Sequence, residues 1–245
     1  MKQKIKIAHA TCCGADHREQ QLGCLSVSAN ADWEDHSAVV LVSGASNHER
    51  ADEIANMIAQ STLTLLGLWG RTWLQNEAAP EEISSVVLAS CRSVLTEHGI
   101  LPKEQTYTLQ FCLVAANGSY YCGNLGGYRF SITHQEARDL DDEATGRGAF
   151  EIVSIGDEDA SRHLYTSSGR LKKNESIVLC NTGMGEALYD SGVSDCEKSL
   201  LRMATWMSLY DTHEMSRVME IAMNNAFIMN TDKDMSIAFI TNAPD

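Results

Sequence analysis

The chain has 245 residues, of which 44% are apolar, so it can bury a sizeable core and is neither disordered nor fibrous. It carries 33 acidic residues against 19 Lys and Arg, and this formal net charge of -14 repels nucleic acid and anionic membranes. Residues 1–9 lack the apolar stretch of a signal peptide, and no segment approaches the roughly 18 apolar residues of a membrane helix. We therefore expect a cytoplasmic protein, organised as one domain over residues 1–245, that binds neither nucleic acid nor membrane.

The eight cysteines show no C-x-x-C spacing, and most lie in apolar runs, which favours buried, reduced thiols. The adjacent Cys12 and Cys13 leave a redox switch as an alternative. Neighbouring residues on a strand point to opposite faces, however, so a disulfide between them would be strained.

In chain order, the first half predicts three strands over 4–10, 24–29 and 37–43, the last apolar throughout and therefore central. Apolar residues at helical spacing predict a helix from about residue 48 to 65 and a second over 80–97. Strands follow over 106–115, 120–122 and 128–133. Asn117-Gly118 predicts a hairpin between the first two of these, with positive φ at both turn residues.

Residues 135–148 are acidic and predict a solvated loop; nothing in their pattern resembles a calcium-binding loop, so a metal site is the weaker alternative. The remaining chain predicts strands over 150–154 and 176–181, helices over 195–209 and 214–227, and a last strand over 235–240. This order indicates an α+β fold in which antiparallel sheets pack together with helices outside.

Four short segments combine strand ends with glycines or small polar residues. The first, over 14–26, contains Gly14, His17, Leu22, Cys24 and Ser26; the second and third are apolar strands that end in Ser43-Gly44 and Thr182-Gly183; the fourth begins the last strand with Lys233-Asp234. A glycine turn over 123–127 lies between the middle strands.

In order and spacing, these segments resemble the motifs of metal-dependent serine/threonine protein phosphatases, the PPM-type or protein phosphatase 2C-like family, and especially its compact bacterial branch. The resemblance implies a four-layer α/β/β/α sandwich, with two antiparallel sheets flanked by helix pairs. It also implies a centre of two manganese or magnesium ions held mostly by aspartates. Here Ser26, Ser43, Thr182 and Lys233 stand at the aspartate positions, although Asp232 or Asp234 could serve if the register slips by one residue.

Magnesium and manganese need anionic oxygen ligands, and hydroxyls bind them poorly. We therefore expect no metal, no cofactor and no catalytic residue, but a degenerate metal site at Ser26, Ser43, Gly44, Thr182, Gly183, Lys233 and Asp234. The function that follows is a metal-free pseudophosphatase that acts as a protein-binding or regulatory module, with a phosphoprotein, a kinase or a phosphatase as its partner.

Two other hypotheses stay open. One is an active phosphatase that uses manganese or magnesium in a rearranged site with Asp16, Asp232 or Asp234; it would gain support if Asp16, Asp32 or Asp35 shared a cleft with Asp232. The other is a different hydrolase or a small-molecule binder on the same sandwich.

Individual side chains also have two interpretations. Lys233 is either a solvated lysine or an ammonium group that fills the cleft by bonding to Asn181, Thr182 or Ser43. His17 is more readily structural than an acid or base. Cys24 and Cys180 lack the Cys-x5-Arg pattern of a thiolate phosphatase. Two further groups of side chains have no role in the motifs. Five methionines and Trp206 recur at near-helical spacing in the C-terminal helices, which favours core packing. Trp69 and Trp73 lie beside Arg71 and are a candidate partner surface. The methionines are Met203, Met207, Met215, Met219 and Met223.

Overall fold

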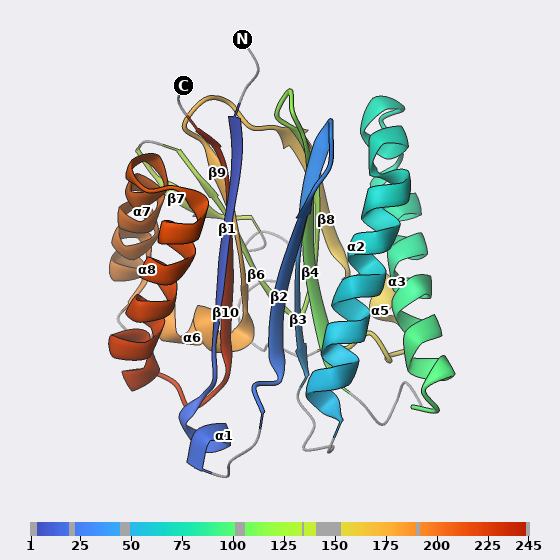
Figure 1. Ribbon diagram of the computed structural model, residues 1–245, viewed down its shortest axis with the longest axis horizontal. Helices are drawn as coiled ribbons and strands as arrows, with labels where there is room; N and C mark the ends of the chain where they lie inside the picture. Colours follow the sequence, from blue (N-terminus) through green and yellow to red (C-terminus); the bar gives the residue numbers. More distant parts are fainter. Residues whose placement is uncertain are drawn as a thin grey trace.

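The computed structural model describes residues 4–19, 23–44, 50–100, 106–133, 135–140, 153–189 and 192–243. Two five-stranded antiparallel sheets pack face to face, with helices on both outer sides (Figure 1). The first sheet has the order β1 (Lys4–Cys12), β10 (Met235–Ala243), β9 (Ser176–Asn181), β6 (Gly127–Ile132), β7 (Ala137–Asp139). The second has the order β2 (Ser26–Asp32), β3 (His36–Gly44), β4 (Tyr107–Ala115), β5 (Ser119–Leu125), β8 (Tyr165–Arg170). The expected α/β/β/α sandwich is confirmed.

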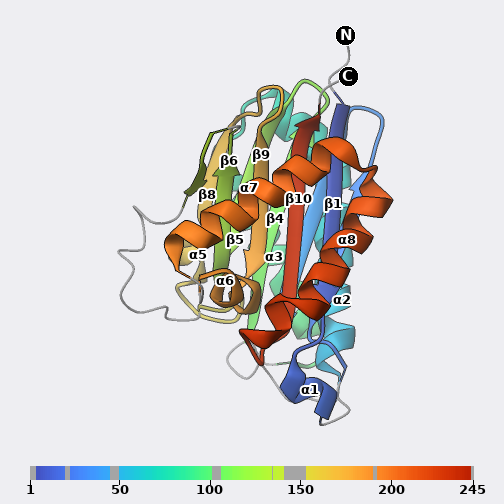
Figure 2. The same ribbon diagram turned by 90° about the vertical axis from the view of Figure 1, so that its left-hand side faces the viewer.

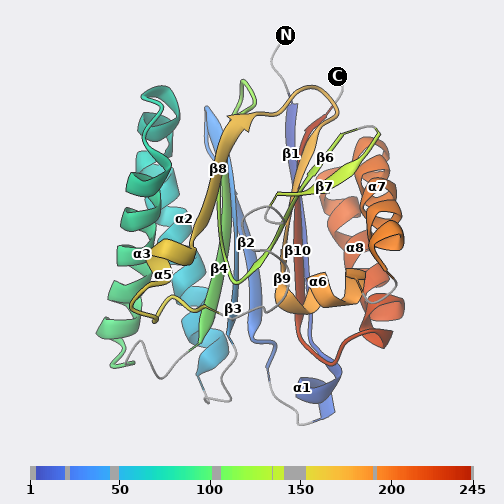
Figure 3. The ribbon, with the colours of Figure 1, turned by 180° about the vertical axis from the view of Figure 1, so that it is seen from behind.

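The helices form the two outer layers. α6 (Thr182–Tyr189), α7 (Val193–Leu209) and α8 (Thr212–Asn225) cover the first sheet, as Figure 2 shows. α2 (Ala51–Gln75) and α3 (Pro80–Glu97) cover the second, with the short α5 (Ala160–His163) beside them (Figure 3). α1 (Ala15–Glu19) lies at the end of the sandwich opposite the chain termini, and a short 3-10 helix, η2 (Phe227–Met229), follows α8.

Strand β3 is apolar along its length because both of its faces are buried. Side chains alternate between the two faces of a strand. Val40 and Val42 pack with the residues under α2 and α3, whereas Val39 and Leu41 pack between the sheets with residues such as Leu179. Both faces of β3 are therefore buried. The strand lies between β2 and β4 in its sheet, so the prediction that it is a central strand is confirmed.

The five methionines of the C-terminal helices, at most 3% exposed, belong to the core under the first sheet, as expected. The eight cysteines are free thiols, and all but Cys13 and Cys24 are buried. The tryptophan pair divides: Trp73 is 7% exposed in the core, while Trp69 is 52% exposed on the outer side of α2.

Several elements differ from the sequence-based expectation. The hairpin between β4 and β5 exists, but Gly118 takes a positive φ of 87° and Asn117 does not, so the loop is not the two-residue turn expected. Residues 137–139 form a strand inside the expected acidic loop, and α1, α5, α6 and β8 were not anticipated as elements. Most of the loop expected over 135–148, and residues 150–152 of the strand expected over 150–154, lie outside the described residues; Val153 and Ser154 are not in a strand.

Candidate functional site

A cleft of about 250 Å³ opens at the α1 end of the sandwich, where β3 and β9 end and β2, β4 and β10 begin. Both sheets contribute to it, so residues far apart in sequence meet there. Its lining comprises Asp16, His17, Leu25, Ser26, Ser43, Gly44, Thr108, Asn181, Thr182, Gly183, Asp232, Lys233 and Asp234. The structure thus brings together all seven positions that the sequence identified as a degenerate metal site.

The floor of the cleft is a network of neutral polar groups. Ser26 and Ser43 are cross-strand partners, and their hydroxyl oxygens lie 2.9 Å apart. The Asn181 side-chain amide lies 3.0 Å from the Ser26 hydroxyl and 3.1 Å from that of Ser43, and it also donates to the backbone oxygen of Asp234 at 2.8 Å. These groups satisfy one another across the two sheets, so the network needs no ion to hold it together.

Asn181 is the last residue of β9 and directly precedes α6. Its side-chain oxygen accepts from the backbone amide of Met184 at 3.0 Å, which is the contact of a helix N-cap, and from the amide of Ser236 at 2.9 Å. The sequence named Asn181 only as one contact of Lys233. Its position as the last strand residue before a helix is the signal that could have identified the cap.

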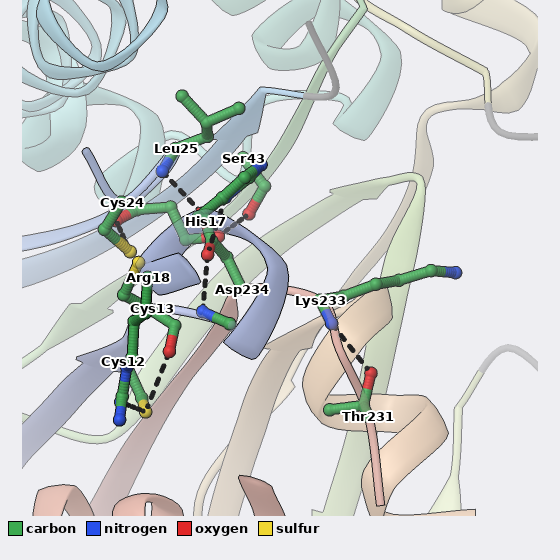
Figure 4. A network of polar contacts seen from close by, with 12 residues as sticks. Cys12, Cys13, His17, Arg18, Cys24, Leu25, Ser43, Thr231, Lys233 and Asp234 are labelled. Atoms are coloured by element: carbon green, nitrogen blue, oxygen red, sulfur yellow. Dashed lines mark hydrogen bonds and ion pairs between the residues drawn. The ribbon is translucent and has the colours of Figure 1, made fainter. Parts of the chain in front are cut away.

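Asp234 is the buried carboxylate of the cleft, at 7% exposure. Its Oδ1 accepts from the backbone amide of Gly14 at 2.7 Å and lies 2.9 Å from Nδ1 of His17, and its Oδ2 accepts from the amide of Leu25 at 2.5 Å. Figure 4 shows these contacts converging on one side chain. Asp234 therefore fixes the loops on either side of α1, and His17 is a structural partner of that carboxylate.

Thr182 and Lys233 both turn away from the Ser26, Ser43 and Asn181 network. The Thr182 hydroxyl donates to the backbone oxygen of Gly126 at 2.7 Å. The Lys233 ammonium bonds to a carboxylate oxygen of Glu186 at 2.6 Å, and its side chain is 54% exposed. Of the two interpretations of Lys233, the exposed lysine agrees with the structure, because the ammonium pairs with Glu186 on α6 instead of bonding to Asn181, Thr182 or Ser43.

Three carboxylates line the cleft, as the active-phosphatase hypothesis requires. Asp16 on α1 and Asp232 before β10 are both exposed, while Asp234 is buried. Asp32 and Asp35 do not line it; Asp35 instead pairs with Arg71 at 3.0 Å and with His36. Within the described ranges, the one group of three or more His, Cys, Asp or Glu whose ligand atoms lie within 4.8 Å of one another is Cys13, Cys24 and Asp234. Asp16 and Asp232 share the cleft but do not form a carboxylate cluster with Asp234.

The donor set does not fit a pair of hard divalent ions. Such ions require several anionic oxygen ligands, whereas Ser26, Ser43 and Asn181 are neutral and already bonded to each other. Of the described residues that line the cleft, Asp234 is the one buried carboxylate, and a single carboxylate cannot offset the charge of two such ions.

The cysteines near the cleft are poor nucleophiles. Burial, followed by the charge of Asp234, raises the pKa of the Cys24 thiol to about 12, and the same two causes raise the pKa of Cys13. Cys180 is buried. A thiolate is the reactive form of cysteine, so neither Cys24 nor Cys180 is placed for covalent catalysis.

Comparison with known proteins defines the fold. No protein-family model and no curated protein sequence matches the chain. Solved structures do: a serine/threonine phosphatase of S. agalactiae has a TM-score of 0.64 at 10% identity, with 97% of this chain and 99% of that one covered. RsbX in complex with magnesium has a TM-score of 0.58 at 8% identity, with 96% and 94% covered. The RsbU and RsbW domains of Rv1364c from Mycobacterium tuberculosis have a TM-score of 0.61 at 12% identity, with 98% and 60% covered.

The chain therefore has the fold of the protein phosphatase 2C-type domains, and the resemblance seen in the sequence is confirmed at the level of fold. None of the described helices combines the length and the apolar character that crossing a bilayer requires.

Proposed function

We propose that this chain is a single-domain, phosphatase-like protein that lacks phosphatase activity and acts by binding another protein. The observation that carries the proposal is the hydrogen-bonded set of Ser26, Ser43 and Asn181 on the floor of the cleft. Two of these residues stand where the motif resemblance places metal-binding aspartates. A neutral, mutually bonded set offers a divalent cation no anionic oxygen.

The charge balance of the cleft supports the same proposal. Two divalent ions bring four positive charges, and carboxylates normally offset them while the ions activate water and stabilise the phosphoryl oxygens. With serine, serine and threonine at three of the aspartate positions, about three negative charges are missing. Lys233 adds a positive charge at the fourth, although its ammonium is paired with Glu186.

The fold favours another protein as the binding partner. The solved neighbours include a serine/threonine phosphatase and a structure of the RsbU and RsbW domains of one protein. For this chain we infer a phosphoprotein, a kinase or an active phosphatase as the partner, in the cytoplasm of a bacterium. The net charge of -14 disfavours nucleic acid as an alternative.

An active phosphatase is the second candidate, and one observation favours it. Asp16 and Asp232 reach the same cleft from two segments far apart in the chain. If the two exposed carboxylates moved together on binding an ion, a rearranged metal site would result. The active-phosphatase hypothesis requires a metal-dependent phosphatase activity that is lost when either Asp16 or Asp232 is replaced.

The test is hydrolysis of a phosphoserine peptide by the purified protein with manganese, with magnesium and with a chelator. The proposal predicts the same background rate in all three. Asp16→Asn and Asp232→Asn should leave that rate unchanged, as should the control Asp32→Asn, which alters an exposed carboxylate on β2 outside the cleft. Metal-dependent turnover that is lost in Asp16→Asn and Asp232→Asn but kept in Asp32→Asn would establish the second candidate instead.

A further inference from the structure

Beside the cleft, two thiols and a carboxylate meet from three separate segments. Cys13 follows β1, Cys24 precedes β2 and Asp234 precedes β10. Their sulfur and oxygen ligand atoms lie within 4.8 Å of one another. Figure 4 shows the side chains of Cys13 and Cys24 turned toward each other. Asp234 also lines the cleft, but neither the phosphatase resemblance nor the proposed function assigns a ligand role to the two thiols.

We propose that Cys13, Cys24 and Asp234 form a binding site for one thiophilic divalent cation, of which zinc is the biological example. Zinc is held tetrahedrally by cysteine sulfur, histidine nitrogen and carboxylate oxygen. Two thiolates and one carboxylate supply three of the four positions, and water takes the fourth. On binding, the ion displaces the two thiol protons into solvent.

Backbone hydrogen bonds already hold the three ligands in place. The amide of Gly14, next to Cys13, donates to Oδ1 of Asp234, and the amide of Leu25, next to Cys24, donates to Oδ2. Both cysteine backbones are thus fixed to the carboxylate that completes the site. His17 bonds to the same carboxylate at 2.9 Å, in the way that outer partners orient the ligands of metal sites.

The partial burial of the group fits an ion that is reached from solvent. Asp234 is buried, whereas Cys13 and Cys24 are half-buried, so the group lies at the boundary between the interior and the surface. A bound cation would offset the carboxylate charge and the charges of the two thiolates together.

The ligand chemistry separates this site from the metal centre that the resemblance implies. Sulfur ligands select zinc and similar ions, whereas magnesium and manganese prefer oxygen. The site would therefore bind zinc or cobalt and leave magnesium and manganese in solution. Its existence does not depend on whether the protein hydrolyses phosphate.

Cobalt(II) is the direct probe, because its absorption spectrum reports both thiolate ligation and tetrahedral geometry. The wild-type protein, reduced with a phosphine and freed of metal by chelation, is titrated with cobalt and then with zinc. We expect one equivalent to give a thiolate charge-transfer band and intense visible bands, which zinc then abolishes. Cys13→Ser and Cys24→Ser should each remove the charge-transfer intensity of one thiolate and weaken zinc binding by on the order of 100-fold or more, beyond what changes to outer partners cause.

Cys12→Ser is the matched control. Cys12 adjoins Cys13, but its sulfur lies 3.0 Å from Nη2 of Arg18 and bonds to Asn224 at 3.4 Å, outside the proposed site. It should keep the full spectrum. Absence of the charge-transfer band in the wild-type protein, or its full retention in both Cys13→Ser and Cys24→Ser, would overturn the proposal.

A measurement on the unaltered chain avoids dependence on variants that fold poorly. Zinc in excess should raise the thermal unfolding midpoint of the wild-type protein, since a ligand that binds only the folded state stabilises it. Magnesium at the same concentration should not. An unchanged midpoint with zinc would contradict the site even if every cysteine variant failed to fold.

Discussion

Asn181 connects more of the cleft than any carboxylate there. Its side chain links β2, β3, β10 and α6 through five hydrogen bonds, to Ser26, Ser43, Asp234, Met184 and Ser236. A buried amide with all its bonds made is costly to remove, because each partner is left without a bond away from water. The residue therefore makes the cleft rigid where the resemblance implies a metal.

Asn181→Ala should lower the free energy of unfolding by about 3 kcal/mol, from the lost helix cap and the unpaired buried groups. Urea denaturation measures it. Asn225→Ala removes an exposed asparagine whose amide bonds only to the Ile221 backbone oxygen within α8, and it should cost less than about 0.5 kcal/mol. Equal losses in the two variants would show that the network has no special stabilising effect.

The glycines of the degenerate motifs have a steric role that is independent of any metal. A Cβ on Gly183 would lie 2.3 Å from the backbone oxygen of Asp234, whereas one on Gly44 would lie 3.1 Å from a ring carbon of Tyr107. Backbone cannot move as readily as the edge of a ring. Gly183→Ala should therefore destabilise the protein by about 1–3 kcal/mol, and Gly44→Ala by less, in the same denaturation assay. The reverse order would contradict this explanation.

His9 joins the two sheets and gives stability a dependence on pH. Its ring nitrogens lie 2.7 Å from the Ser28 hydroxyl and 2.8 Å from the side-chain oxygen of Asn30. Burial lowers its pKa from the ordinary value of 6.5, while the bond to Asn30 acts in the opposite direction. The unfolded chain thus binds a proton more readily, and the contribution of His9 is complete above pH 6.5 and is lost as the pH falls below it.

His9→Gln should therefore flatten the fall in unfolding free energy between pH 7.5 and pH 5, and His98→Gln, on an exposed side chain after α3, should not. Urea denaturation at each pH measures both. A wild-type slope in His9→Gln would show that other groups produce the pH dependence.

At the scale of elements, the long periodic segments were predictable and the short ones were not. α3 and β9 have the bounds that the sequence indicated, because a proline at the helix start and an unbroken apolar strand are strong local signals. β8 has an exposed C-terminal half, with Ser168, Gly169 and Arg170, so it carries no apolar alternation and is defined only by its pairing with β5. The three residues of β7 are likewise defined by their pairing with β6.

The residues of the site likewise fall into those that the sequence predicted and those that it did not. Strand ends placed Ser26, Ser43 and Thr182 at one edge, which the motif order anticipated. The pairing of Lys233 with Glu186 and the group formed by Cys13, Cys24 and Asp234 depend on tertiary distances that no local pattern encodes.

Helix α2 offers a matched pair of tryptophans for a packing test. Trp73 is buried against the second sheet, and Trp69, one turn earlier, is exposed. Trp73→Ala should cost about 3–5 kcal/mol of unfolding free energy through the cavity it leaves, whereas Trp69→Ala should change it by less than about 0.5 kcal/mol. Calorimetric unfolding compares them, and a large loss in Trp69→Ala would mean that this face of α2 is covered.

At the scale of the whole molecule, the sandwich has the fold of protein phosphatase 2C-type domains, and neutral side chains stand in its cleft where the motif resemblance implies aspartates. Both sheets meet at the cleft through neutral groups, and the buried carboxylate of Asp234 fixes the loops on either side of α1. The proposed site of Cys13, Cys24 and Asp234 shares that carboxylate and would bind a different class of metal.

The most direct test of the central claim is calorimetric titration of the reduced wild-type protein with manganese. We predict no heat of binding beyond dilution at millimolar manganese. As a comparison, the variant with Ser26→Asp, Ser43→Asp, Thr182→Asp and Lys233→Asp should gain affinity if it folds. Micromolar binding of manganese to the wild-type protein would contradict the claim, because it would mean that the cleft already contains enough charge to hold the ion.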